Sequence, residues 1–466
     1  MTDAGPFEPS RLPRLTVWAG GGVHTYLDLE RRRDAIASEL RRCFVRPTDP
    51  LCVVMSANVD SVAALVAAAR ERSVLLLPPS LRPEELETFL HSSRVRGILA
   101  TKRDADQLGL GRRFQSTSLP DGIVLFTPIS RHEVSEQVGL SAAQAGSICQ
   151  VTSGSTSASR LAVRTSSGIA AEIDSVARTI ELNSSDRVLV GSSVAHSYGL
   201  MGGLLASMQA GAEVALAPDA ETAVAIIGSW RPTVLFGLPP LYELLLASDR
   251  PDHLGDARLF LSAGAPLRAQ LHDSFYYATG LPIRQDYGTT EAGTIAIDHE
   301  EPVHPRAVGR PLQHMDVRLL PEPRQSVDEV IVRSPAVASW YIAENGALDS
   351  CLDSNGWFHT GDVGEWDDSG RLTLKRRIRS LVEVEGQLVD PYSLEQLLEN
   401  VPGIKEAAVY ADKDGGLRAV IALSKGWSAR EAENRAKTAG GEFIDAFELR
   451  PALPRSPAGK VLYKYL

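Results

Sequence analysis

Short apolar runs alternate with amphipathic segments through the first half of the chain, and this alternation constrains the fold more than any other feature. Segment 26–44 spaces its apolar residues three and four apart, which predicts a helix, and the apolar run 51–57 after it predicts a buried strand. The same pattern then predicts helices at 60–73 and 84–93 and strands at 74–80 and 97–102. Strands that are joined through helices run parallel and are covered on both faces. We therefore expect an α/β fold.

The alternation returns in the middle of the chain and then changes character. It predicts helices at 202–211 and 220–230 and strands at 186–192, 213–218, 233–240 and 258–264. From about His314 strand patterns predominate, and from about Ser380 short helices and strands are mixed. We expect a large N-terminal domain over residues 1–376, with parallel-type sheets, covering helices and a β-rich portion, and a small, mobile α+β lid over residues 377–466.

Charge and hydropathy limit the partners of the chain. A net charge of −10 over 466 residues argues against nucleic acid, because most of the surface would repel a polyanion. No charged residue lies between Arg187 and Glu213, but serines, a histidine and glycines interrupt this stretch, so a buried strand, a loop and a buried helix fit it better than a membrane span. The N-terminus lacks the apolar core of a signal peptide, and the four cysteines are scattered. We expect a cytoplasmic protein with no membrane partner and with reduced cysteines.

Segment 151–160, VTSGSTSASR, follows an apolar run and is rich in glycine, serine and threonine. The backbone N–H groups and hydroxyls of such a loop can surround phosphates. The segment lacks the GxxxxGK[ST] pattern of a Walker loop. By itself the pattern is more typical of a flexible loop than of a phosphate site.

Two further motifs place a carboxylate among small or hydroxylated residues. Segment 285–293, QDYGTTEAG, sets Glu291 beside Thr289 and Thr290, and these oxygens suit Mg²⁺ held against phosphates. Segment 356–364, GWFHTGDVG, contains Asp362, which could accept hydrogen bonds from a ribose diol. Taken singly, each motif also fits an ordinary polar turn.

The C-terminal segment LPRSPAGKVLYKYL places Lys460 directly after Gly459. A lysine held in such a loop could stabilise negative charge that develops on a phosphoryl group. The order of the motifs is more specific than any one of them. Together with SAGAP at 262–266 and a basic segment near 376–380, they resemble the adenylate-forming superfamily of acyl-CoA synthetases, carrier-loading adenylation domains and luciferases over nearly the whole chain.

The resemblance implies that the chain binds ATP and Mg²⁺ through these motifs. The implied nucleotide contacts are, for the β- and γ-phosphates, Thr152, Ser153, Gly154, Ser155 and Thr156; for adenine, Gly264, Ala265, Pro266, Asp286 and Tyr287; and for ribose, Asp362 supported by Arg377. The implied reaction groups are Thr290 at the α-phosphate, Glu291 as the Mg²⁺ ligand, and Lys460 between the substrate carboxylate and the α-phosphate.

The implied reaction is attack of a carboxylate on the α-phosphate, which gives an acyl-adenylate and pyrophosphate. Rotation of the lid then allows acyl transfer to an acceptor, which in this family is CoA or the phosphopantetheine of a carrier protein. The implied acid pocket is formed by His196, Ser197, Tyr198, Gly199, Gly237, Gly264 and Gly288. The AHSYGL segment has no carboxylate to bind an α-amino group, so an aryl or acyl acid is favoured over an amino acid.

The sequence departs from the family pattern at two places. The phosphate loop ends in Ser157, Ala158, Ser159 and Arg160 where the family has glycine, any residue, proline and lysine. The segment EVEGQL, which follows the basic segment near 376–380, is acidic and would repel the phosphates of CoA. A non-thiol acceptor, as in amide-forming ligases or nitrite-using diazotases, is therefore an alternative. A non-catalytic nucleotide-binding relative is a second one, against which the retention of Glu291, Asp362 and Lys460 argues.

Overall fold

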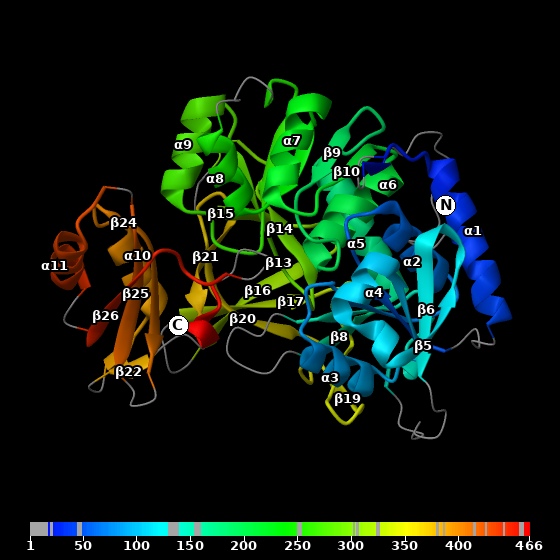
Figure 1. Cartoon of the computed structure of the whole chain (residues 1–466). Coiled ribbons are helices and arrows are strands. Elements are labelled where there is room, and N and C mark those ends of the chain that lie inside the picture. The colour runs from blue at the N-terminus through cyan, green and yellow to red at the C-terminus, as the bar shows by residue number, and fades with distance from the viewer. Residues whose placement is uncertain are drawn as a thin grey trace. The chain divides into compact units, whose positions relative to one another are not determined.

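The computed structural model divides the chain into two compact units (Figure 1). Unit 1 comprises Met1–Val317 and Val332–Phe358, and unit 2 comprises Arg318–Ile331 and His359–Leu466. The structure describes residues 17–18, 22–43, 49–128, 139–152, 160–248, 254–301, 303, 307–322, 327–378, 382–384, 387–412, 416–424, 426–440, 443–455 and 461–466.

One sheet of unit 1 has a parallel centre and antiparallel edges. In spatial order its strands are β19 (Leu348–Ser350), β18 (Trp340–Ile342), β8 (Leu161–Arg164), β7 (Ile148–Val151), β3 (Val74–Leu77), β2 (Leu51–Val54), β4 (Gly97–Thr101), β6 (Ile123–Pro128) and β5 (Phe114–Ser118). β2, β3 and β4 pair in parallel, as the alternation predicted, and β7 also pairs in parallel with β3.

Three helices of this part of unit 1 follow the predicted segments closely: α1 (Tyr26–Arg42), α2 (Val59–Ala69) and α3 (Pro83–Ser93). The structure adds α4 (Lys102–Leu108) and the short 3₁₀ turns η1 (Leu110–Arg112), η2 (Pro120–Gly122) and η3 (Gly139–Ala142), which were not predicted. Thr25 and Asp28 form a reciprocal capping box at the start of α1, which satisfies exposed backbone donors. Almost every residue of α2 is buried, because this helix is apolar or small on all sides.

The second group of strands in unit 1 is also parallel over most of its width. In spatial order these strands are β1 (Val17–Trp18), β10 (Glu213–Leu216), β9 (Arg187–Val190), β11 (Val234–Gly237), β12 (Leu259–Ser262), β13 (Ile283–Thr289), β14 (Gly293–Ile297) and β15 (Ala307–Pro311). In this spatial order, each neighbouring pair from β1 through β10, β9, β11 and β12 to β13 is parallel. β14 pairs antiparallel with β13 and with β15.

Six helical segments accompany these strands. They are α5 (Ser166–Thr179), η4 (Tyr198–Leu205), α6 (Ala206–Ala210), α7 (Ala220–Trp230), α8 (Pro239–Ala247) and α9 (Ala269–Thr279). α7, α8 and α9 lie side by side (Figure 1), and their apolar side chains share one core with β9, β11 and β12. Apolar burial of this kind stabilises a fold by about 25 cal/mol per Å².

The helix expected at 202–211 differs from the prediction in its form. The structure begins it earlier, at Tyr198, and winds the first part, η4, as a π-helix before α6 continues as an α-helix. Gly202 and Gly203 lie against the side chains of Phe236 and Val190, and a Cβ atom there would come within 3.1 Å and 3.0 Å of them, so a larger residue would require these side chains to shift. π-helical turns are rare and occur mostly near functional sites.

Unit 2 combines a twisted group of strands with a small α+β body. The neighbouring strands β21 (Leu372–Arg377), β20 (Phe358–Trp366), β17 (Val327–Arg333) and β16 (Asp316–Glu322) precede a β22 (Val382–Val384) and β23 (Gln387–Val389) hairpin. The remaining elements are α10 (Pro391–Glu399), β24 (Ile404–Ala411), β25 (Leu417–Leu423), α11 (Ala429–Gly440), β26 (Ala446–Arg450) and the 3₁₀ turn η7 (Tyr463–Tyr465).

The sheet of β24, β25 and β26 is covered on both faces. Alternate residues such as Ala407 and Val409 pack against α10 and α11. The intervening residues Ala408 and Val420 pack against the end of the chain, including Leu453 and Tyr463. The α+β character of this region was predicted; the mobile lid over 377–466 remains a prediction.

Two expectations, about membrane-spanning helices and about cysteine chemistry, can be compared with the described residues. None of the helices described there is long and apolar enough to cross a membrane. All four cysteines are described and are free thiols, two of them, Cys52 and Cys149, being buried. Burial raises the pKa of both thiols, which keeps them protonated and unreactive.

Candidate active site

The predicted site residues of unit 1 gather at the carboxyl ends of neighbouring parallel strands. Segment His196–Gly199 follows β9, Gly237 ends β11, Gly264–Pro266 follow β12, and Asp286–Thr289 end β13. These strands are hydrogen-bonded neighbours in the order β9, β11, β12, β13. In open parallel sheets this edge is where ligands bind, so the topology brings together residues that are far apart in sequence.

The segment expected to line adenine forms a turn after β12. Gly264 has a φ of +80°, a conformation that glycine adopts without strain and other residues rarely adopt. Gly264 and Pro266 are exposed and Ala265 is half-buried, so all three can contact a ligand.

Asp286, expected to accept from the adenine amine, lies buried on β13. Its Oδ2 atom is buried and has no hydrogen-bond partner among the described residues. Burial, and then the nearby carboxylate of Glu172, raise the pKa of Asp286 well above its ordinary value, although a hydrogen bond with the Thr294 side chain acts in the opposite direction. The unpartnered acceptor suits an amine donor. Tyr287 beside it is 7% exposed.

Thr290 and Glu291 lie in a tight turn between β13 and β14. The Ala292 N–H donates to Thr289 Oγ1 at 3.0 Å and holds the turn closed. A side chain at Gly288 would come within 2.3 Å of the Gly293 carbonyl, so the close approach of the two strands requires glycine. Thr290 and Glu291 are half-buried and therefore remain accessible at the strand ends.

A short segment near β18 holds Glu291 at two points. The Tyr341 hydroxyl donates to Glu291 Oε1 at 2.8 Å, and the Ala338 N–H donates to the Glu291 carbonyl at 2.7 Å. The guanidinium of Arg160 lies over the Tyr341 ring, with its central carbon 3.9 Å from the ring centroid. No motif in the sequence indicated Tyr341, because its partners are distant in the chain.

The predicted phosphate loop is described only at its two ends. The Thr152 N–H donates to the Arg160 carbonyl at 2.8 Å, and the Arg160 N–H donates to Thr152 Oγ1 at 3.1 Å. These reciprocal bonds hold the two ends of the loop together. Ser153, Gly154, Ser155 and Thr156 lie outside the described residues.

A buried charge network that the sequence did not predict lies behind these segments. Arg164 donates to the Ser197 hydroxyl at 3.0 Å, to the Ala336 carbonyl at 2.9 Å and to the Glu172 carboxylate. Glu172 also accepts from the Thr294 N–H at 2.8 Å. The network thus joins β8, α5, the His196–Gly199 segment and β14. Arginine in the apolar run LAVR was the available signal, because a charge inside a buried strand needs a partner.

The residues expected to form the acid pocket are tightly packed against the chain itself. The Tyr198 hydroxyl donates to the Leu261 carbonyl at 3.0 Å, and Ser197 is bound to Arg164. A side chain at Gly199 would lie 2.5 Å from the Ser193 carbonyl, and one at Gly237 would lie 2.8 Å from the Tyr242 ring. The two glycines are therefore required by close packing, and the role of these residues in acid binding remains a prediction.

Unit 2 brings Asp362 and Arg377 together. They are opposite each other on the antiparallel strands β20 and β21, and Arg377 Nε donates to Asp362 Oδ1 at 2.8 Å. The Thr360 hydroxyl accepts from the Asp362 N–H at 3.0 Å, and the neighbouring Gly361 N–H donates to Glu329 at 2.9 Å. The expected support of Asp362 by Arg377 is thus present as an ion pair.

Lys460 lies outside the described residues, but the residues around it are held firmly. Arg455 and Val461 form an antiparallel bridge, and the Leu462 N–H donates to the Pro454 carbonyl at 2.8 Å. The Tyr463 hydroxyl donates at 2.7 Å to Glu395, which also accepts from the Val409 N–H. Burial raises the pKa of Glu395 to about 7. The two ends of the Lys460 segment are therefore fixed to the sheet of unit 2.

Comparison with known proteins assigns the chain to a family. The family model described as AMP-binding enzyme matches residues 10–342, which is more than half of the chain. The chain belongs to the AMP-binding enzyme family. It is thus a member of the adenylate-forming superfamily, as the motifs indicated, and an enzyme of the AMP-forming acid ligase class.

Relatives of this AMP-binding enzyme match it along almost its whole length. It is 27% identical to 4-coumarate–CoA ligase 2 of Oryza sativa subsp. japonica, over 97% of the chain and 89% of that protein. It is 27% identical to a feruloyl-CoA synthase of Amycolatopsis sp., over 95% of the chain and 93% of that protein. Its fold resembles ATP-bound MatB from Rhodopseudomonas palustris, with a TM-score of 0.83, 21% identity, and coverage of 100% and 98%.

The residues of the β13–β14 turn are suited to hold a Mg²⁺ ion whose other ligands come from a substrate. The described residues contain no cluster of three or more metal-binding side chains. Glu291 supplies one carboxylate beside the hydroxyls of Thr289 and Thr290. Mg²⁺ commonly binds through one or two carboxylates together with substrate phosphates, so a single carboxylate in the β13–β14 turn fits this chemistry.

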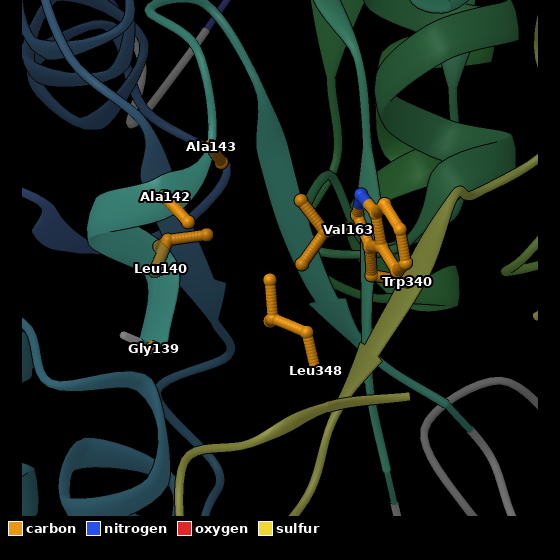
Figure 2. A pocket seen from close by; sticks show the side chains of 7 residues that line it. All are labelled: Gly139, Leu140, Ala142, Ala143, Val163, Trp340 and Leu348. Atoms are coloured by element: carbon orange, nitrogen blue, oxygen red, sulfur yellow. The ribbon is translucent and has the colours of Figure 1, made fainter. Parts of the chain in front are cut away.

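A small apolar pocket in unit 1 is distinct from these residues. Figure 2 shows side chains of η3, β8, β18 and β19 around it, among them Leu140, Val163, Trp340 and Leu348. Its volume of ≈ 20 Å³ suits one water-sized molecule and is far too small for a substrate.

Proposed function

We propose that the enzyme activates an aryl or acyl carboxylic acid with ATP and transfers the acyl group to the thiol of CoA or of a carrier protein. The acid attacks the α-phosphate of ATP, the bond to pyrophosphate breaks, and an acyl-adenylate forms. The thiol then attacks the acyl carbon and AMP leaves. The family match supports this reaction, and the named substrates of the relatives, coumarate and ferulate, support an aryl acid.

The proposal assigns specific tasks to the residues of unit 1. The Asp286 acceptor binds the adenine amine, and Tyr287 and Gly264–Pro266 lie against the purine. Thr290 donates to the α-phosphate, and Glu291 is the protein ligand of Mg²⁺. When bound, Mg²⁺ would neutralise charge on the phosphates, which is the main contribution that proteins and metals make to phosphoryl transfer.

The proposal also assigns tasks to unit 2. Asp362 accepts from a ribose hydroxyl, and Arg377 orients its carboxylate through their 2.8 Å hydrogen bond. Lys460 places a positive charge between the acid carboxylate and the α-phosphate. A preorganised cation of this kind acts where charge develops in the transition state.

Two proposals differ in the acceptor of the acyl group. The acidic segment EVEGQL favours a non-thiol acceptor, an amine or nitrite, because it would repel the phosphates of CoA. The CoA-ligase names of the relatives favour the thiol. We therefore place the thiol first and the non-thiol acceptor second.

Pyrophosphate release with a panel of aryl and acyl acids tests the first half-reaction. CoA, a loaded carrier protein, amines and nitrite are then added one at a time, and product is followed by mass spectrometry. Pyrophosphate without an acceptor and an acyl thioester with CoA are the expected results. Failure to release pyrophosphate with any acid would leave only the non-catalytic relative, and product with amine or nitrite alone would replace the thiol.

A further inference from the structure

We propose that Tyr341 is a positioning residue that joins Arg160, at the end of the phosphate loop, to Glu291 and thereby sets the affinity of the enzyme for metal-bound nucleotide. The inference rests on the proposed function for the presence of a nucleotide, but it concerns a residue that the motifs do not include. Its observations all lie within unit 1.

The backbone of Tyr341 is fixed next to the phosphate loop. β18 pairs antiparallel with β8, which places Tyr341 opposite Ala162, two residues after Arg160. Tyr341 is 7% exposed, and its ring packs with Ala162, Ala338 and Cys351. A buried ring on a paired strand loses little further freedom when it binds a neighbour, so it is suited to hold other groups in place.

The Tyr341 hydroxyl and the nearby Ala338 backbone orient Glu291. The Tyr341 hydroxyl donates to Oε1 of Glu291, and the Ala338 N–H donates to the carbonyl of the same residue. With one carboxylate oxygen bound to the phenol, a metal would be presented with the other. Partners of this kind orient metal ligands in many proteins.

The aromatic ring of Tyr341 holds the guanidinium of Arg160. Its guanidinium lies 3.9 Å from the centroid of the Tyr341 ring, and the residue is exposed. A planar guanidinium stacks on an aromatic ring and still donates to phosphate, whereas lysine is a flexible point charge. An arginine in place of the family's lysine suits this position, because its planar guanidinium can stack on the ring and donate to phosphate from its edge.

A metal-bound nucleotide requires both groups at once. Its phosphates need a cation and its metal needs a carboxylate, and Tyr341 fixes the separation between them through its ring and its hydroxyl. Removal of the hydroxyl should therefore weaken binding that depends on the metal, while removal of the stacking should weaken binding of the phosphates.

The test measures binding and not turnover. Free Mn²⁺ is titrated by electron paramagnetic resonance with the full-length enzyme and α,β-methylene-ATP, and binding of the same nucleotide in EDTA is measured by calorimetry. Tyr341→Phe should weaken Mn²⁺ binding to the nucleotide complex by about tenfold, as expected for loss of a group that orients a metal ligand. Its metal-free nucleotide affinity should stay within about twofold of the wild type.

Tyr242→Phe is the matched control, because it removes another buried tyrosine hydroxyl of unit 1, one that donates to the Leu261 carbonyl and not to a carboxylate. It should leave Mn²⁺ binding unchanged. Equal Mn²⁺ affinity in wild type and Tyr341→Phe would overturn the proposal, as would an equal loss in the Tyr242→Phe enzyme.

Arg160→Lys tests the second interaction at an exposed position that folding tolerates. It should weaken nucleotide binding about threefold both with and without metal, because the stacking is lost while the charge remains. If Tyr341→Phe does not fold, unchanged nucleotide affinity in Arg160→Lys overturns the proposal on its own. An enzyme that binds Mn²⁺ and nucleotide as expected but releases no pyrophosphate with any acid would refute the proposed function and leave this inference standing.

Discussion

Each unit contains an arginine–carboxylate pair that includes or contacts a predicted site residue, and the two pairs differ in how far they are enclosed. Arg164 and Glu172 in unit 1 have side chains that are 1% and 0% exposed, and both make further hydrogen bonds to the protein. Arg377 and Asp362 in unit 2 are 49% and 10% exposed. The enclosed pair joins segments of the fold, whereas the exposed pair can also interact with a ligand. The same chemical pair thus serves structure in one unit and is proposed to serve binding in the other.

The largest expected effect comes from breaking the enclosed pair. Glu172→Ala leaves the Arg164 charge buried without its carboxylate, so it should lower the stability of unit 1 by about 3–5 kcal/mol. Urea denaturation, followed by hydrogen exchange of peptides from β8 and α5, measures the loss. The double substitution Arg164→Met and Glu172→Leu should recover most of it, because no isolated charge remains. A single substitution with wild-type stability would show that the pair is not the structural element described here.

Glu395 provides an enclosed carboxyl in unit 2 with an effect that depends on pH. Its pKa rises from 4.5 to about 7 on folding, because burial disfavours the charged form. The folded state therefore binds the proton more tightly, so this stabilisation is full below pH 4.5 and is lost as pH rises through 7, in total roughly 3 kcal/mol. Hydrogen exchange of peptides from α10 and β24 at pH 5 and pH 8 measures it.

Glu395→Gln is the control for that pH dependence, because the amide does not titrate. The variant should lose the difference between pH 5 and pH 8 in these peptides while other peptides behave as in the wild type. A pH dependence that is the same in both proteins would assign the titration to another group.

Lys460 represents the opposite case, a charge proposed to act on the substrate. Lys460→Ala should lower acyl-adenylate formation by about a hundredfold or more, as when a preorganised charge is removed, and should leave the stability of unit 2 unchanged. Pyrophosphate release and thermal unfolding are measured on the same sample. Lys464→Ala, which changes a lysine in the same C-terminal segment, is the matched control. Unchanged release in Lys460→Ala would refute the catalytic role.

The smallest effect on stability is expected from the exposed pair. Arg377→Ala should change the stability of unit 2 by less than about 1 kcal/mol, because ion pairs that reach solvent contribute little. It should nevertheless weaken nucleotide binding several-fold if Asp362 binds ribose, which calorimetry with AMP measures. Arg333→Ala, whose arginine pairs with Asp316 and is also exposed, is a control that should leave AMP binding unchanged. A large loss of stability without loss of AMP binding would show that Arg377–Asp362, like Arg164–Glu172, is a structural pair.

The sequence predicted local elements well wherever apolar spacing was regular. The expected helix 220–230 is α7 to the residue, and the strands expected near 51–57, 74–80 and 97–102 are β2, β3 and β4, which pair in parallel within one sheet. α9 was not predicted, because its Phe275, Tyr276 and Tyr277 are consecutive aromatics although only the first is buried. Burial and not residue type distinguishes them, and burial is a property of the fold.

The sequence by itself determined the α/β class and the family, and it predicted the residues that bind nucleotide and activate the acid, since Asp362, Glu291 and Lys460 stand in recognisable local motifs. Only the tertiary structure decided what holds these residues. Tyr341 meets Glu291 across 50 positions and Arg164 meets Ser197 across 33, and the wide π-helical turn at Tyr198 forms where Gly202 and Gly203 meet neighbouring side chains. A motif is encoded by neighbours in the chain, whereas a buried hydrogen bond needs a partner that only folding brings within reach.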